Sequence, residues 1–132
     1  MPVSPNAAQP DPVARLRVAF HISGGACYVS HLDQTRAWVR ALRRLGLPLA
    51  YSHGFNPHPR VSVAAPLAVG VCGERELLDL YFDAPVDPTE LRRILPGEMP
   101  PGFSVHGVEA IPLNSPPLPS LVVAADYVVR FL

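Results

Sequence analysis

The sequence predicts an α+β domain of the ferredoxin-like class, in which one antiparallel sheet carries two helices on one face. Three observations lead to this prediction. Segments with strand alternation and segments with helical periodicity follow one another in the order βαββαβ. Both helical segments carry their own start and stop signals. Right-handed crossover connections leave few other arrangements for this order.

The first strand and the first helix have the clearest patterns. Residues 16–22, LRVAFHI, alternate between apolar and other residues, which indicates a strand with one buried face. Ser30 and Asp33 match the capping pattern of a helix start, and Gly46 supplies the left-handed stop of a helix over residues 31–45. The stripe expected to face the core consists of Leu32, Thr35, Val39 and Leu42, with Trp38 and Leu45 at its border.

The middle of the chain is harder to divide into elements. Residues 47–51, LPLAY, are short and apolar and predict the second strand. Residues 52–59, SHGFNPHP, form a loop that its prolines make rigid. Residues 61–64 are also strand-like, but the βαββαβ order requires residues 61–75 to be an elaborated connection between the second and third strands.

The second half repeats the helix-then-strand pattern. Residues 76–82 alternate as a third strand. Asp87 as N-cap and Pro88 in the first turn then start a helix, which Pro96 ends. Residues 103–111 alternate again and predict the last strand of the sheet.

Proline-rich segments at both ends of the predicted domain divide the chain into four parts. Residues 1–14 are expected to be a flexible leader, and residues 15–111 form the ferredoxin-like domain. Residues 112–120 are a proline-rich spacer. Residues 121–132 are expected to be either an edge strand of this domain or the start of a truncated second domain.

Composition favours a globular protein of the cytoplasm. Apolar residues make up 48% of the chain, no apolar run approaches the length of a membrane span, and the N-terminus does not resemble a signal peptide. Cys27 and Cys72 lie far apart without a CxxC pattern, and we interpret them as buried free thiols.

The net charge is zero, but the charges are segregated. Residues 31–60 contain five arginines and one acid, whereas residues 71–109 contain eight acids and three arginines. Arg36, Arg40 and Arg44 follow one another at intervals of four positions on the first helix, so they share a sector of its surface. Spaced guanidinium groups can bind phosphates, so this sector is a candidate phosphate or RNA surface. The alternative is a solvated face whose arginines pair with acids.

The loop after the second strand is the next candidate site. Phe55, Asn56, His58 and Arg60 could stack on and hydrogen-bond a planar ligand such as an unpaired base. For Phe55 alone we favour core packing beneath the loop, because a single aromatic residue is usually buried.

A third set of residues could support metal or acid–base chemistry. His31, Asp33 and His58 are weak candidates for metal ligands, and His31 or His58 for an acid–base catalyst. No HxH or HExxH spacing connects them, and the helix cap already explains Asp33.

Several motifs also resemble those of a known family. They are SHLD at residues 30–33, RALRR at residues 40–44, YS at residues 51–52, GFNPHPR at residues 54–60, and Pro66-Leu67 with Gly70. In these motifs the chain resembles the uncharacterised radical SAM-linked protein family, a domain of unknown function found beside or fused to a radical SAM protein. The resemblance covers residues 15–132. It implies a radical SAM partner that carries the iron–sulfur cluster and S-adenosylmethionine, while this chain binds no cofactor.

The function expected from these features is that of an accessory binding module. Its arginine-bearing helix and GFNPHPR loop would present RNA or another phosphate-bearing substrate to the radical SAM partner, without contact with a membrane. Two alternatives remain open. One is a small metal-dependent or histidine-based acid–base enzyme of the nuclease type, and the other is a docking domain for the partner protein.

Overall fold

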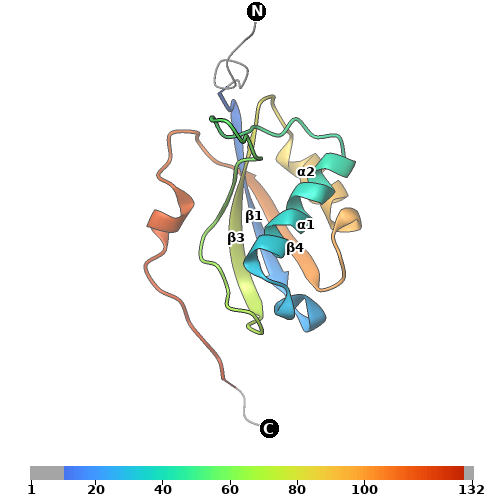
Figure 1. Cartoon of the computed structure of the whole chain (residues 1–132), viewed down its shortest axis with the longest axis vertical. Helices are drawn as coiled ribbons and strands as arrows, with labels where there is room; N and C mark the ends of the chain where they lie inside the picture. Colours follow the sequence, from blue (N-terminus) through green and yellow to red (C-terminus); the bar gives the residue numbers. More distant parts are fainter. Residues whose placement is uncertain (1–10, 130–132) are drawn as a thin grey trace, which may run out of the picture.

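The computed structural model describes residues 11–129, which form a mixed α+β domain (Figure 1). Within this range the chain forms β1 (Ala14–Ile22), α1 (His31–Arg44), β2 (Val61–Val63), β3 (Gly73–Phe82), α2 (Pro88–Ile94) and β4 (Phe103–Ala110). The short 3-10 turns are η1 (Gly24–Tyr28), η2 (Leu95–Glu98) and η3 (Leu118–Leu121). Most of the predicted leader, residues 1–10, lies outside the described residues.

The strands of this range form one antiparallel sheet in the order β2-β3-β1-β4. The central strand β1 pairs with β3 on one side, where Leu16 lies opposite Leu80, and with β4 on the other, where Val18 lies opposite Val108. This order, with one helix after β1 and one after β3, fits the ferredoxin-like α+β class predicted from the sequence. Figure 1 shows both helices on the same face of the sheet.

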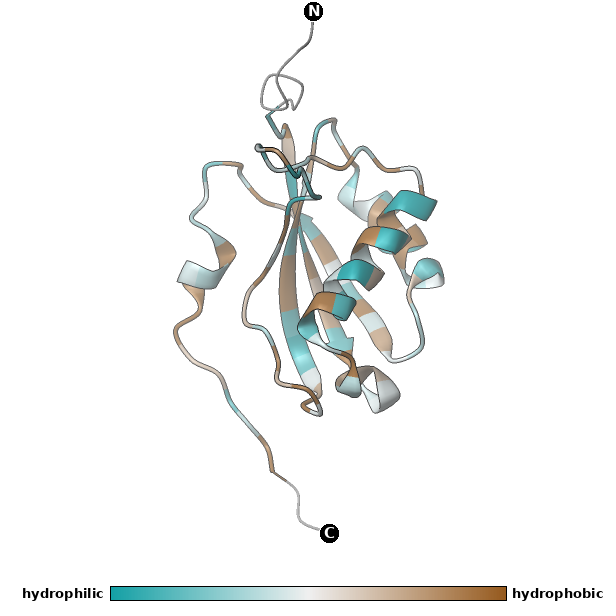
Figure 2. Ribbon diagram, in the orientation of Figure 1, coloured by the Kyte–Doolittle hydropathy of each residue, from teal (hydrophilic) through white to brown (hydrophobic). Residues whose placement is uncertain are grey.

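The core lies between this sheet face and the helices. The alternation predicted for the first strand is confirmed, because the even-numbered residues from 16 to 22 are buried and the odd-numbered residues from 17 to 21 are not. Trp38 of α1 packs edge-on against Phe20 and Phe103, with ring centroids 4.9 and 5.8 Å away. Figure 2 shows the complementary pattern, with hydrophilic residues along the outer side of α1.

The predicted helix ends are confirmed by their hydrogen bonds. The Ser30 hydroxyl accepts a hydrogen bond from the Asp33 amide at 3.2 Å and caps α1. Gly46, with φ of 70°, takes the left-handed conformation that ends this helix. At the start of α2, the Asp87 carboxylate accepts a hydrogen bond from the Thr89 amide at 3.0 Å.

The buried face of α1 differs in part from the predicted stripe. Leu42 and Trp38 are buried as core residues, but Leu32 is 57% exposed. Ala37 and Ala41 are buried in its place. Their small side chains let the helix approach the sheet closely, and the large Trp38 side chain then fills the remaining space. Trp38 therefore lies at the centre of the buried face rather than at its border.

The position of the second strand was predicted wrongly. Residues 47–51 form only isolated bridges, between Leu49 and Phe82 and between Tyr51 and Pro59. The strand that joins the sheet is β2, which pairs along the middle of β3. Residues 47–51 reach β3 only at its end, through the Leu49–Phe82 bridge and a hydrogen bond of 2.9 Å from the Ala50 amide to the Tyr81 carbonyl, so no regular ladder forms there.

The two cysteines form a disulfide, and the interpretation as free thiols was wrong. Cys27 of η1 and Cys72 lie 45 residues apart in the sequence, with Cα atoms 4.9 Å apart. Cys27 is buried and Cys72 is exposed. The Gly70 amide also donates a hydrogen bond of 2.7 Å to the Cys27 carbonyl. The loop before β3 is thus attached to η1 by a covalent bond and by a backbone hydrogen bond.

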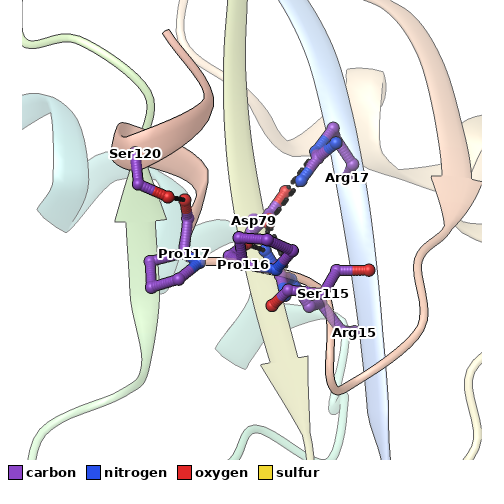
Figure 3. A network of polar contacts seen from close by, with 7 residues as sticks. All are labelled: Arg15, Arg17, Asp79, Ser115, Pro116, Pro117 and Ser120. Carbon is purple, nitrogen blue, oxygen red and sulfur yellow. Dashed lines mark hydrogen bonds and ion pairs between the residues drawn. The ribbon is translucent and has the colours of Figure 1, made fainter.

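Residues 112–121, here called the strap, cross the sheet face that carries no helix. The Arg15 guanidinium donates hydrogen bonds to the carbonyls of Ser115 and Pro116 at 2.7 and 2.8 Å, and Leu118 is buried. Figure 3 shows Arg15 with Ser115 and Pro116 of the strap. The predicted spacer therefore packs against the domain. Residues 122–129 form no strand, and residues 130–132 of the predicted edge strand lie outside the described range.

Candidate functional site

The GFNPHPR segment lies in a loop that its own hydrogen bonds close. The Ser52 amide donates to the His58 carbonyl at 2.8 Å, and the His58 amide donates to the Ser52 hydroxyl at 3.2 Å. The Nδ1 atom of His58 lies 3.1 Å from the same hydroxyl and 3.3 Å from the Asn56 carbonyl oxygen. Gly54 has φ of 131°, a conformation that other residues rarely adopt. The loop is therefore fixed at its base by residues 52 and 58.

The tip of this loop projects into solvent. Phe55 is 90% exposed, and Asn56 and His58 are exposed beside it. The favoured interpretation of Phe55 as a core residue was wrong. The hydrogen bonds between Ser52 and His58 separate the tip from the domain, so the ring has no core beneath it. The loop thus presents one aromatic ring with an amide and an imidazole nearby.

Arg60 leaves the loop and lies on the strap side of the sheet. Its guanidinium carbon is 4.4 Å from the centroid of the Tyr81 ring, and that of Arg15 is 5.4 Å from the same centroid. Tyr81 pairs with Arg15 in the ladder and alternates with the core residue Leu80. Its ring therefore lies on the face without helices. The alternation of residues 76–82 predicts that Tyr81 lies on this face. No sequence pattern predicts its cation–π contact with Arg60.

The arginines of α1 differ in their partners. Arg36 pairs with Asp33 at 3.3 Å, on the exposed surface of the helix. Arg44 donates to the Glu98 carboxylate at 2.8 Å and to the Glu98 carbonyl at 2.7 Å. Arg40 and Arg43 are exposed, and neither forms an ion pair or a side-chain hydrogen bond with any residue between 11 and 129. Arg43 is not among the phosphate-binding residues predicted from the sequence.

The predicted binding residues do not gather on one surface. Arg40 lies on α1, which covers one face of the sheet, whereas Arg60 packs on Tyr81 on the opposite face. Asn56 and His58 stand with Phe55 at the exposed tip of the loop. A ligand that contacts both the helix and the loop must therefore extend over the surface of the domain.

The weak metal and acid–base candidates are not assembled into a site. Asp33 pairs with Arg36, and His31 is exposed in the first turn of the same helix. His58 contacts Ser52 and Asn56 within the loop. Over residues 11–129, no three histidine, cysteine or acidic side chains lie close enough together to hold a metal ion. Within the described chain, neither His31 nor His58 forms a hydrogen bond with a carboxylate that could orient an imidazole for catalysis.

These features define a small ferredoxin-like α+β domain with a closed loop that projects an aromatic residue. Residues 15–131 match the family described as uncharacterized proteins conserved in bacteria, DUF2344, and the chain belongs to this family. No curated protein and no solved structure has a significant match to the chain. Among the helices of residues 11–129, none has the length and apolar character needed to cross a membrane.

Proposed function

We propose that the chain is an accessory binding module that works with a radical SAM protein in the cytoplasm. In this role it holds RNA, or another phosphate-bearing substrate, through the GFNPHPR loop and the exposed arginines of α1. The observation that carries the proposal is the exposure of Phe55 at the tip of a loop closed by hydrogen bonds.

The exposed side chain of Phe55 gives the folded domain little hydrophobic stabilisation. Burial of such a side chain contributes about 1.5–3 kcal/mol, which the isolated domain does not gain from Phe55. Stacking of an unpaired base on the ring would recover a similar free energy. Asn56 and His58 are exposed in the same loop and can hydrogen-bond the polar edge of a base. Because the loop is already closed, little conformational entropy is lost on binding.

The arginines of α1 supply the electrostatic part of the proposed interaction. Arg40 and Arg43 have no acidic partner within residues 11–129, so their guanidinium groups are available for phosphate. They belong to α1, whereas the loop tip projects into solvent from the segment between α1 and β2. A nucleic-acid strand can span such separate contacts, whereas a small ligand cannot. The separation therefore favours RNA over a small phosphate-bearing molecule.

The test uses the full chain and an unstructured single-stranded RNA oligonucleotide. Phe55→Ala should weaken binding roughly tenfold, because stacking on an aromatic residue contributes about 1–3 kcal/mol per base. Arg40→Ala should lower the slope of log affinity against log salt by about 0.7 for each lost phosphate contact. The matched control is Arg36→Ala on the same helix, where Asp33 already pairs with the guanidinium and the slope should change less.

Unchanged affinity and salt slope in a Phe55→Ala, Arg40→Ala double variant would contradict the proposal. The exposed Phe55 ring also fits a docking surface for the radical SAM protein, because aromatic residues often dominate protein interfaces. In that case a complex with the partner would survive nuclease treatment and high salt, and Phe55→Ala would break it.

A further inference from the structure

The sheet face without helices carries a hollow that no predicted site residue lines. Its volume is about 710 Å³. The residues around it are Ala19, His21, Glu74, Arg75, Glu76, Leu77 and His106. They come from β1, β3 and the bulged part of β4.

Small side chains in the middle of the sheet produce the hollow. Ala19 of β1 pairs with Leu77 on one side and with Gly107 on the other, so these three residues lie side by side on the same face. An added Cβ atom at Gly107 would meet no atom within 4 Å. Arg17 and Asp79, two residues along each strand, form an ion pair of 2.8 Å that borders this depression on the strap side.

Two imidazole rings stand at the other border. The rings of His21 and His106 come from neighbouring strands, with centroids 5.9 Å apart and planes inclined by 38°. Arg75 of β3 lies across β1 from His106. Imidazole and guanidinium planes are groups on which nucleobases stack, and both can donate hydrogen bonds to phosphate. The apolar side chains of Ala19 and Leu77 form the floor between them.

The two glutamates of the hollow restrict where a negative charge can bind. Glu76 pairs with the buried Phe20 in the ladder, so its carboxylate belongs to the helix face of the sheet. Glu74 is exposed at the strand end next to Arg75. A phosphate is therefore expected beside Arg75 and the two imidazoles. The negative charge of Glu74, next to Arg75, would weaken the binding of phosphate there.

We propose that this hollow binds a nucleotide, with its base over Ala19 and Leu77 and its phosphate near Arg75 and the two histidines. The nucleotide is either a free mononucleotide or an unpaired residue of an RNA strand. This site is distinct from the Phe55 loop, because the strap and the Arg17–Asp79 pair lie between them. Binding here therefore does not require RNA binding at the loop.

The experiment is a titration of the isotope-labelled full chain with AMP, followed by NMR. AMP should shift the amide signals of residues 19, 21, 77 and 106, and it should bind more tightly than adenosine or inorganic phosphate alone. His106→Ala and Arg75→Ala should each weaken AMP binding roughly tenfold, as expected for one lost stacking or charged contact. Glu74→Gln removes the negative charge that repels the phosphate, so this variant should bind AMP more tightly.

Gly107→Val gives a variant whose fold is expected to persist, because the new side chain enters open space on a strand that favours valine. It should fill the hollow and abolish AMP binding, while Phe55→Ala should leave AMP binding intact. A single-stranded oligonucleotide that competes with AMP would identify RNA as the source of the nucleotide, and the absence of competition would identify a free mononucleotide. The proposal is wrong if AMP shifts none of these four amides, or if Gly107→Val binds AMP as well as the natural chain.

Discussion

Two acidic residues of β3 illustrate how the environment of a side chain decides its contribution. Asp79 is fully buried, yet its carboxylate accepts hydrogen bonds of 2.8 Å from both Arg15 and Arg17. The hydrogen bond that Arg17 donates to the Asp79 carboxylate raises the pKa of Arg17. Glu76 is partly buried without any ion pair within residues 11–129, and burial raises the pKa of its carboxyl group above the ordinary value of 4.5. The charge of Asp79 is compensated, whereas that of Glu76 is not.

Glu76→Gln should therefore stabilise the protein at neutral pH. With a raised pKa, the folded protein binds more protons than the unfolded chain between pH 4.5 and the folded pKa. The stability of the natural protein therefore falls as the pH rises through this window. Glutamine carries no charge, so the variant should melt at a higher temperature at pH 7.

Thermal melts of both proteins from pH 3.5 to 7.5 test this prediction. The advantage of the variant should shrink as the pH falls and disappear below pH 4.5. A difference in melting temperature that stays constant across this range would contradict the role assigned to the Glu76 charge.

At the scale of elements, local signals predicted the helices better than the strands. The Ser30 and Asp87 caps and the Gly46 stop act within one or two turns, so the sequence alone contains the information. The choice of residues 61–63 over residues 47–51 as the second strand depends on which segment reaches the middle of β3. That depends on contacts between distant residues, which a local pattern cannot show.

For the candidate site, the sequence predicted which residues form the loop but not how their side chains are oriented. The sequence indicated a rigid loop, and the structure places its base at Ser52 and His58. Whether Phe55 points inward or outward depends on the hydrogen bonds between Ser52 and His58, which close the base of the loop. These residues are six positions apart, and no periodic sequence pattern predicts such a pairing. The cation–π contact of Arg60 with Tyr81 likewise joins residues that only the folded sheet brings together.

The disulfide between η1 and the loop before β3 should contribute strongly to stability. A bond that closes a segment of 45 residues is expected to add about 4 kcal/mol through the unfolded state. Cys72 is an exposed residue, and thiolates keep accessible disulfides reduced in a reducing compartment. Incubation with dithiothreitol should therefore lower the melting temperature by roughly 10 °C or more.

The matched control for reduction is a Cys27→Ala, Cys72→Ala double variant. It should melt at a lower temperature than the oxidised protein and show no response to dithiothreitol. Equal melting temperatures for the oxidised and reduced natural protein would show that the bond does not constrain the fold.

At the scale of the whole molecule, the two faces of the sheet have different roles. One face is covered by α1 and α2 and forms the core (Figure 1), while the other carries the strap and the Arg15–Asp79–Arg17 network (Figure 3). The open hollow lies on this second face. The segregation of charge seen in the sequence is reduced by folding, because Asp33 and Glu98 neutralise Arg36 and Arg44. The proposed RNA surface is therefore narrower than the sequence indicated.

The most direct test of the proposed function is a map of the RNA-binding surface. Titration of the isotope-labelled full chain with unstructured single-stranded RNA, followed by NMR, should produce its largest amide shifts at residues 53–56 and 58, with smaller shifts near Arg40 and Arg43. Saturation of the protein with RNA while the amides of residues 53–58 remain unshifted would contradict the account.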